Sequence, residues 1–449
     1  MQAHILRVRS QDILAARPRG HALGLLVGDL LVTMHVARER QLPLLLLERE
    51  ETRDSPLLRL ECAGIVAVNG AVRGAAMRRW RTAVVRDAAV DAAADAAVNA
   101  WNAAVNWARR RCQAMVIFHS SPHPLSIASI ITRRRQRHPP QGRVPSPRNL
   151  VKLKGGEVMQ RLEAAKWHRS PRSVYESHDL RKYAAQAPLG ARLSAGDEEE
   201  ARRAAAAAGV PHDRMLIAMH VRGSAAGGAA DRGKDAIRNA DVASYIPAVN
   251  ALVARGFTVV RIGDSSMPPL QVPGVIDLAS QPRNPLLHFW CVSRSRFFLA
   301  GDSGPYLLSW LFGTPCLAVN IVNVLGVYPL RAHDRYIVKR VRERSTGRTL
   351  PFEEMLDEKF VYGFRLRLLK EASIELIDNT ADEIRDAAVE MADALETPAP
   401  PTPRQLRFRA LVSQARAGSI SQSKLFEKVG RSDSYLGDGW VSDSFVARE

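Results

Sequence analysis

Cysteine is scarce in this sequence of 449 residues. Its cysteines are Cys62, Cys112, Cys291 and Cys316; they form no CxxC pair, and no histidine stands at zinc-site spacing from two of them. A disulfide framework and a structural zinc site are therefore not indicated. We predict buried, reduced thiols in a cytosolic protein.

Long uninterrupted apolar runs are missing as well. The N-terminal MQAHILRVRSQD has no apolar core, so no secretory signal is predicted. Residues 303–330 carry no charge and are numerous enough to cross a bilayer, but glycine, proline and asparagine interrupt them. We therefore predict a buried helix followed by a buried strand, in a protein that is soluble or bound peripherally to a membrane.

Two motifs that hold phosphates are also absent. The sequence contains no GxxxxGK[ST] loop and no DxD pair of aspartates. These absences argue against a P-loop nucleotidase and against an enzyme that holds a diphosphate through a DxD-bound metal. We expect no metal and no cofactor, so arginines and helix dipoles must neutralise any diphosphate that binds.

Positive charge, by contrast, is abundant. Lys and Arg number 64 against 46 Asp and Glu, for a net charge of +18 and a pI near 10.3. This excess suits a nucleic acid, a polyanionic small molecule or an anionic membrane face. Residues 133–154 are basic and contain no acidic and no aromatic residue. Because single-strand binders interleave aromatics with basic residues, we expect no nucleic-acid partner. An exposed basic loop and a segment that orders on an anionic partner both remain open.

The central part of the chain alternates between strand-like and helical patterns. Helices are predicted over residues 241–255, from Asn284 to residue 292, and from residue 303 to Gly313. Between them lie short β-branched runs at residues 215–221, 258–262, 275–278, 296–300 and 316–319. This alternation is typical of an α/β fold with a parallel sheet covered on both faces.

The flanking regions extend this pattern. Strands are predicted at residues 5–8, 44–47, 65–68 and 115–118, and helices at 25–40 and 84–109. Thr380 and Glu383 form a capping box that begins a helix ending at Leu395. Residues 397–403 form a proline-rich hinge, and residues 404–449 suggest one helix and an irregular tail. The length suggests more than one domain.

Polar residues follow several predicted strands at their carboxyl ends, where open α/β sheets bind ligands. His220 and Arg222 follow the first of these strands, and Arg222 offers a planar fork suited to phosphate oxygens. Each motif also has an ordinary structural interpretation, as a strand-end salt bridge, a helix cap or a turn. The other candidates are Arg238, Asn239, Asp264, Asp302, Ser303 and Gly304. Ser303 and Gly304 begin a helix, whose free N–H groups suit a phosphate.

These same residues carry a resemblance to a known family. The run RNADVASYIPAVNALVARGFTVVRIGD, from Arg238 to Asp264, together with FFLAGDSGP and DNTADEIRDAAVEM, resembles a group of bacterial glycosyltransferases associated with surface-polysaccharide gene clusters. The similarity covers residues 190–395. More distantly, the HxR of His220 and Arg222 resembles a donor motif of fucosyltransferases, and the DSGP turn resembles the donor loop of heptosyltransferases. An acidic residue often follows HxR in those enzymes, whereas Gly223 stands here.

The resemblance implies a GT-B architecture and a metal-independent transferase of hexosyl or deoxyhexosyl groups. Residues 1–185 would form a Rossmann-like, acceptor-side domain, residues 186–395 a Rossmann-like domain that binds the nucleotide sugar, and residues 396–449 a helical extension. Arg222 would stabilise the leaving diphosphate, and His21 and Asp29 are the candidate acceptor bases.

The expected acceptor is a glycan or a lipid-linked sugar. The expected location is the cytoplasm, with peripheral contact at the inner membrane through residues 131–154. Two other functions remain open. One is a scaffold of sugar-nucleotide fold without catalysis, and the other, suggested by the charge, is nucleic-acid binding.

Overall fold

The structure is a computed structural model, and it describes residues 2–8, 11–17, 23–41, 44–46, 55–61, 189–212, 215–223, 236–265, 267–322, 331–355, 373–422 and 439–448. The expected strands at 65–68 and 115–118, the helix at 84–109, the basic segment 133–154, His21 and Cys62 lie outside them. The chain divides into one unit of residues 1–4, 14–67 and 172–449, and another of residues 5–13 and 68–171. Almost all described residues belong to the first unit.

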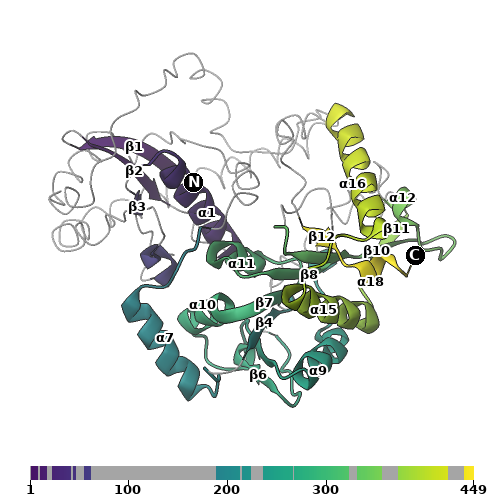
Figure 1. Ribbon diagram of the computed structural model, residues 1–449, viewed down its shortest axis with the longest axis horizontal. Helices are drawn as coiled ribbons and strands as arrows, with labels where there is room; N and C mark the ends of the chain where they lie inside the picture. Colours follow the sequence, from purple (N-terminus) through teal and green to yellow (C-terminus); the bar gives the residue numbers. More distant parts are fainter. Residues whose placement is uncertain are drawn as a thin grey trace, which may run out of the picture. The chain divides into compact units, whose positions relative to one another are not determined.

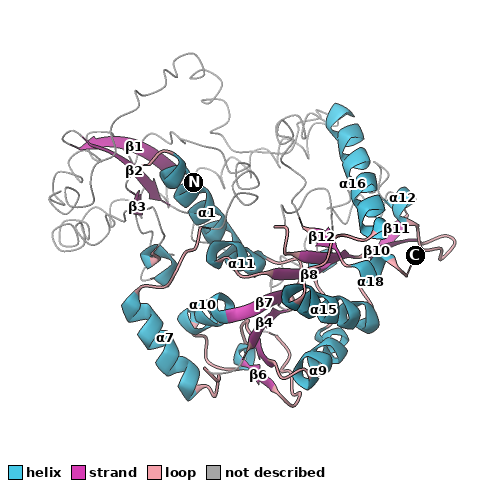
Figure 2. Cartoon of the chain, viewed as in Figure 1, coloured by secondary structure: helices cyan, strands magenta, loops and turns pink. Residues whose placement is uncertain are grey.

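The centre of this unit is a seven-stranded sheet (Figures 1 and 2). Every neighbouring pair of its strands is parallel, which confirms the predicted α/β class. The order across the sheet is β12 (Trp440–Val441), β9 (Arg335–Val338), β8 (Cys316–Ile321), β7 (Ser295–Ala300), β4 (Leu216–His220), β5 (Thr258–Arg261) and β6 (Val275–Asp277).

The strand order reverses next to β4. From β4 the chain moves outward to β5 and β6, then returns to place β7 on the other side of β4 and continues outward to β8 and β9. This is the order of doubly wound nucleotide-binding folds, in which ligands bind outside the carboxyl ends of the strands at the reversal. The topology thus singles out the loops that follow β4 and β7.

Helices cover both faces of the sheet (Figure 1). On one face α9 (Ile246–Ala254) packs against α15 (Ala381–Glu396), and on the other α10 (Pro285–Arg294) packs against α11 (Leu307–Phe312) and α7 (Ala195–Ala207). Their ends follow the expected chemistry. The Asn284 side chain accepts a hydrogen bond from the Leu287 amide, and α11 stops at Gly313, whose φ of 79° lies in the left-handed region.

The expected helix at 241–255 begins differently from the prediction. Asp241 caps a 3-10 turn, Val242–Tyr245, and α9 starts only at Ile246. Two further 3-10 turns lie near the carboxyl edge of the sheet, Ala236–Arg238 and Leu278–Ser280, and a fourth covers Pro56–Arg59. The turn around Val242 keeps the segment before α9 tightly wound beside the sheet.

The capping box at the start of α15 is present as predicted: Thr380 accepts from the Glu383 amide, and Glu383 accepts from the Thr380 amide. Before it, β10 (Arg340–Glu343) pairs with β11 (Ile374–Ile377) as a separate antiparallel sheet. A short helix, α12 (Phe352–Met355), lies between them in the chain. After α15 comes α16 (Pro403–Gln422), the predicted C-terminal helix.

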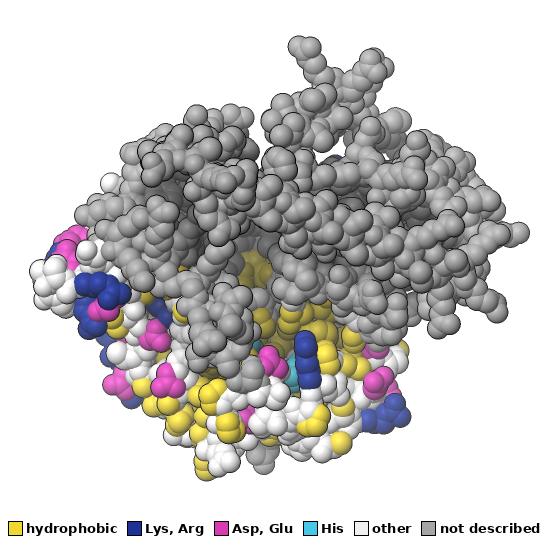
Figure 3. Space-filling model, turned by 180° about the vertical axis from the view of Figure 1, so that it is seen from behind, with side chains coloured by type: hydrophobic (Ala, Val, Ile, Leu, Met, Phe, Trp, Pro, Cys, Tyr) yellow, Lys and Arg dark blue, Asp and Glu magenta, His cyan; other side chains and the backbone are white. Residues whose placement is uncertain are grey.

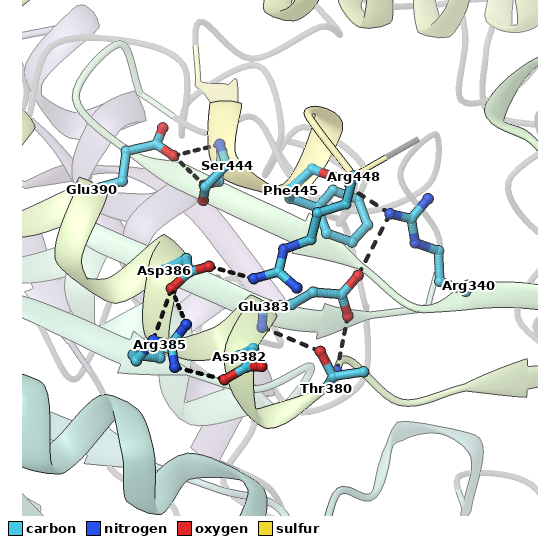
Figure 4. A network of polar contacts seen from close by, with 11 residues as sticks. Arg340, Thr380, Asp382, Glu383, Arg385, Asp386, Glu390, Ser444, Phe445 and Arg448 are labelled. Carbon is cyan, nitrogen blue, oxygen red and sulfur yellow. Dashed lines mark hydrogen bonds and ion pairs between the residues drawn. The ribbon is translucent and has the colours of Figure 1, made fainter.

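The sequence suggested an irregular C-terminal tail, but the described residues 439–448 of that tail form regular elements. β12 pairs with Arg335 and Tyr336 of β9 and extends the central sheet, and α18 (Asp443–Val446) follows it. Glu390 on α15 accepts from the amide of Ser444 (Figure 4) and from that of Asp443, which secures the start of α18. A two-residue strand leaves too short a periodic pattern to be recognised in sequence, so tertiary contacts decide it.

The N-terminal residues form β1 (Gln2–Val8), β2 (Gln11–Arg17), α1 (Leu23–Glu39) and β3 (Leu44–Leu46). The sequence predicted α1, β1 and β3 but missed β2, which lies in the middle of the three-stranded sheet. All residues from Leu26 to Ala37 are buried, and α1 packs against α11. No helix in the described parts of the chain combines the length and apolar character that spanning a membrane requires. Cys291 and Cys316 are buried free thiols.

Candidate functional site

The carboxyl ends of β4 and β7 meet at one edge of the sheet. His220, the last residue of β4, pairs in register with Ala300, the last residue of β7, and the Gly301 amide donates to the His220 carbonyl at 3.1 Å. Arg222 and Asp302 each lie two residues further along. The strand register therefore brings together loops whose sequence positions differ by about eighty residues.

Arg222 is held in place by two residues of the segment before α9. Its Nε donates to Asn239 Oδ1 at 3.1 Å, and its own carbonyl accepts from the Ala240 amide at 3.0 Å. A side chain and a backbone contact together fix both the stem and the direction of this guanidinium. The sequence proposed Arg222 and Asn239 as separate ligand contacts; the structure brings them into direct contact.

Arg238 reaches the loop after β7 and pairs with Asp302. Its Nε donates to the Asp302 carbonyl at 2.9 Å and to Asp302 Oδ1 at 3.2 Å. The other carboxylate oxygen of Asp302 accepts from the Val322 amide at 3.2 Å. Asp302 is 3% exposed. With both oxygens engaged by protein groups, Asp302 orients Arg238 and the loop after β8.

His220 is a buried, neutral imidazole. The pKa of His220 is lowered to about 4, first by burial and then by the positive charge of Arg261, against an opposing effect of Asp264. Its Nδ1 is buried and has no hydrogen-bond partner among the described residues. Near pH 7 this side chain therefore acts as a hydrogen-bonding group rather than a cation, and its unpaired nitrogen is unusual for a buried polar atom.

The carboxyl end of β5 adds a third arginine, and this one is buried. Arg261 is 1% exposed and donates through Nη1 to Asp277 Oδ2 at 3.1 Å and to the Pro268 carbonyl at 2.7 Å, but its Nε has no partner in the described structure. The next loop holds Asp264. A Cβ on Gly263 would lie 2.4 Å from Met267 Sδ, so a larger residue here would force the Met267 side chain to move.

His288 lies on α10 near the same loops. Burial, followed by the charge of Arg283, lowers the pKa of His288 to about 4. The carboxyl edge of β4, β5 and β6 thus combines neutral histidines and arginines with the carboxylates of Asp264 and Asp277. Strongly shifted titratable groups gathered at one sheet edge are typical of functional sites.

The helix that begins after Asp302 is less suited to binding a phosphate than the sequence suggested. Gly304 begins a 3-10 turn, Gly304–Tyr306, and α11 that follows has six residues. So short a helix has only a small dipole. Ser303 is 4% exposed and its side chain makes no capping hydrogen bond. The helix-terminus interpretation of Ser303 and Gly304 is therefore weaker than the arginine interpretation of the site.

A buried polar network that the sequence did not indicate lies beside the site. Asn320 near the end of β8 has a φ of 56° and exchanges two 2.7 Å hydrogen bonds with Asn379, one through the amide of each residue. Its Nδ2 donates to the Tyr245 hydroxyl at 3.2 Å. Tyr245 is fully buried, and burial raises its pKa. Asn320 thus combines a left-handed backbone, which asparagine tolerates better than most residues, with a buried and paired side chain.

The network also contains Lys339, whose Nζ donates to the Asn239 carbonyl at 2.9 Å. One signal could have indicated Lys339, because it directly follows the apolar run at residues 336–338. No sequence signal indicated Asn320, which lies within the predicted apolar stretch and belongs to no motif. The structure therefore ties the segment 236–245 to the sheet at four residues: Asn239, Arg238, Tyr245 and Ala240.

Of the two candidate acceptor bases, the structure describes only Asp29. His21 lies outside the described residues. Asp29 is on α1, is 2% exposed, and its carbonyl accepts from the Thr33 hydroxyl. The helix that carries Asp29 packs against α11 and the turn Gly304–Tyr306. Its catalytic role remains a prediction.

The described surface does not present one broad basic patch on the face shown in Figure 3. Dark-blue Lys and Arg side chains are interspersed there with magenta Asp and Glu. Among the described residues, no three His, Cys, Asp or Glu side chains are grouped to hold a metal ion. Much of the excess positive charge lies in the remainder of the sequence, including residues 133–154.

No protein-family model matches the chain, and no curated protein matches it. Two solved structures are similar to it. One is the ADP-heptose LPS heptosyltransferase II of E. coli, with 16% identity over 40% of this chain and 53% of that chain, and a TM-score of 0.26. The other is a glycosyl transferase family 9 protein of Veillonella parvula, with 11% identity over 72% and 85% of the two chains, and a TM-score of 0.34. This chain thus spans about half of the heptosyltransferase, and likenesses this weak establish neither family nor function.

Proposed function

We propose that the chain is a glycosyltransferase that moves a hexosyl or deoxyhexosyl group from a nucleotide diphosphate to a glycan or lipid-linked acceptor in the synthesis of a cell-surface polysaccharide. One observation carries the proposal. Two arginines, Arg222 and Arg238, are oriented by protein partners at the strand-order reversal of a doubly wound sheet. The resemblance of residues 190–395 to bacterial glycosyltransferases supports it independently.

The chemistry follows from the charge that develops when the sugar leaves. The departing diphosphate gains negative charge, and a preoriented guanidinium stabilises that charge without reorganising in the transition state. Arg222 supplies this group, and Arg238 adds a second cation whose direction Asp302 sets. His220, neutral near pH 7, hydrogen-bonds an oxygen of the bound donor through its unpaired Nδ1.

The remaining parts of the donor site follow the order of the strands. Asp264, after β5, accepts from a ribose hydroxyl, as carboxylates at this position do in related folds. Asn239, Asp302, Ser303 and Gly304 complete the donor site, the first two by orienting the arginines. Transfer is metal-independent in this proposal, because arginines take the place that a DxD-bound metal has in other enzymes.

The proposal extends to organisation and location. Residues 1–185 form the acceptor-side domain and supply the base, with His21 and Asp29 as candidates. Residues 186–395 hold the donor, and residues 396–449 complete its outer layer. The protein acts in the cytoplasm, with peripheral contact at the inner membrane through the basic residues 131–154.

The test begins with donor binding. Thermal unfolding is measured with GDP-, UDP-, ADP- and CMP-sugars, and one of them should raise the melting temperature, because a ligand at one hundred times its Kd stabilises by about 2.7 kcal/mol. With that donor, Arg222→Ala should lower kcat by at least about 100-fold while the fold stays intact. Arg255→Ala is the matched control, because Arg255 pairs with Asp393 on the surface at the far end of α9.

The outcomes separate the alternatives. Full transfer or donor hydrolysis in Arg222→Ala contradicts the role of Arg222. Donor binding without transfer or hydrolysis in the wild-type chain favours the scaffold. A salt-dependent shift of random oligonucleotides, without donor binding, favours the nucleic-acid alternative.

A further inference from the structure

A buried lysine stands behind the candidate site. Lys339, between β9 and β10, is 4% exposed, and its Nζ donates to Asp378 Oδ1 at 2.5 Å and to the Asn239 carbonyl at 2.9 Å. Burying an ammonium is costly unless partners replace its water. Asp378 offsets the charge, but the second hydrogen bond spans 100 positions of sequence to a residue of the site.

Asn239 joins two cations. Its carbonyl accepts from Lys339, and its side-chain oxygen accepts from Arg222 Nε at 3.1 Å. A displacement of Asn239 therefore changes the direction of the Arg222 guanidinium. We propose that Lys339 is a positioning residue for Arg222: it holds Asn239 in place, and Asn239 in turn aims Arg222 at a diphosphate. This inference rests on the proposed function and names a residue that the donor itself does not touch.

Asp378, which pairs with Lys339, is held in place by the two residues that follow it in the chain. Asp378 is followed by Asn379, which pairs with Asn320 and donates to the Val338 carbonyl at 2.8 Å, and then by Thr380, which caps α15. Three consecutive residues thus fix the point at which the Lys339 ammonium is held. A rigid supporting layer of this kind is what orients a ligand-binding side chain to within a fraction of an ångström.

The experiment compares anion affinity by calorimetric titration of the full chain with inorganic pyrophosphate, UDP, GDP and ADP. Lys339→Met should weaken the probe that binds best by about tenfold, within the range that coupled neighbours show. The variant Lys339→Met with Asp378→Asn removes both charges and leaves none unpaired, so it separates affinity from folding. Arg340→Met is the matched control, because it removes the adjacent cation, which pairs with Glu383 and lies over the Phe445 ring (Figure 4). The same guanidinium also lies over the Phe352 ring.

A double-mutant cycle distinguishes positioning from general stability. In an Arg222→Ala background, Lys339→Met should produce no further loss of affinity, because its effect passes through Arg222. A structural role would lower the melting temperature equally in both backgrounds and leave the affinity unchanged. Asp378→Asn alone changes a half-exposed side chain that keeps an oxygen able to accept from Lys339, and it should weaken the probe severalfold. Its melting temperature is measured alongside.

The results overturn different claims. If the wild-type chain binds none of the probes, the proposed function fails. If Arg222→Ala binds a probe more weakly than the wild-type chain, but the Lys339 and Asp378 variants bind like the wild type, the positioning role fails while the function stands. An equal loss of affinity from Lys339→Met in both backgrounds also overturns it.

Discussion

The two edges of the central sheet treat buried charge differently. At the amino edge of β8 and β9, Arg331 donates through Nε and Nη2 to the two carboxylate oxygens of Asp334. Its Nη1 donates to the Ser309 carbonyl, and its Nη2 also donates to the Thr314 carbonyl. Asp334 accepts in addition from the amides of Cys316 and Arg331. Asp334 is fully buried, and its charge is surrounded by donors. This edge is built to hold the loops together.

At the carboxyl edge, Arg261 is also buried and pairs with an aspartate, yet among the described residues nothing pairs with its Nε or with Nδ1 of His220. Unpaired nitrogens occur at the amino edge too, on His333 and Arg335, but those side chains are partly exposed, and Arg335 still donates to two carbonyls. The amino edge thus surrounds its buried charge with protein donors, whereas the carboxyl edge, where we propose that the donor binds, keeps two buried nitrogens that no described residue pairs.

The largest effect is expected where the amino edge is broken. Asp334→Asn leaves Arg331 buried without a counter-charge and should lower the free energy of unfolding by about 3–5 kcal/mol, measured by urea denaturation. Asp393→Asn removes an aspartate from an exposed pair with Arg255 and should cost about 1 kcal/mol or less. A loss at Asp334 no larger than that at Asp393 would contradict the structural role of this edge.

A smaller effect on the free energy of unfolding is expected at the carboxyl edge when the pH is lowered, because two histidines are buried there. His220 and His288 have pKa values lowered from 6.5 to about 4, so between these values the unfolded chain binds more protons and stability falls as the pH falls. Each histidine should cost about 2 kcal/mol between pH 7 and pH 5, measured by urea denaturation at both values.

The matched variant for this pH dependence is His288→Asn, which cannot titrate. It should remove about half of the slope that the two histidines cause. The same pH dependence in His288→Asn as in the wild type would show that His288 is not held neutral in the fold.

The smallest effect on stability is expected at Gly313, in the turn that precedes β8 at the amino edge. Gly313 has a φ of 79°, so Gly313→Ala should lower stability by about 1 kcal/mol. Gly196→Ala is the matched control, because a Cβ there meets nothing within 4 Å inside α7, and it should stabilise by about 0.5 kcal/mol. Probe binding should not change in either variant. If Gly313→Ala weakens binding, the amino edge contributes to the site after all.

Local signals in the sequence predicted most of the central unit. β-branched runs indicated β4, β5, β6, β7 and β8, the capping box indicated α15, and Asn284 followed by proline indicated α10. The sequence missed β2, β9, β10, β11 and β12, because each depends on pairing with a neighbour rather than on its own period. The strand order was not predictable residue by residue, because parallel strands paired across long connections carry no local mark of their partners.

For the site, the sequence by itself determined which side chains stand at strand ends: His220, Arg222, Asp264 and Asp302 each follow a buried run. Only the tertiary structure decided what each one does. It set both oxygens of Asp302 against protein donors, left His220 buried and neutral, and linked Lys339 to Arg222 through Asn239. The physical reason is that periodicity and capping act over a few residues, whereas burial, counter-charge and hydrogen-bond partners come from segments that only folding brings together.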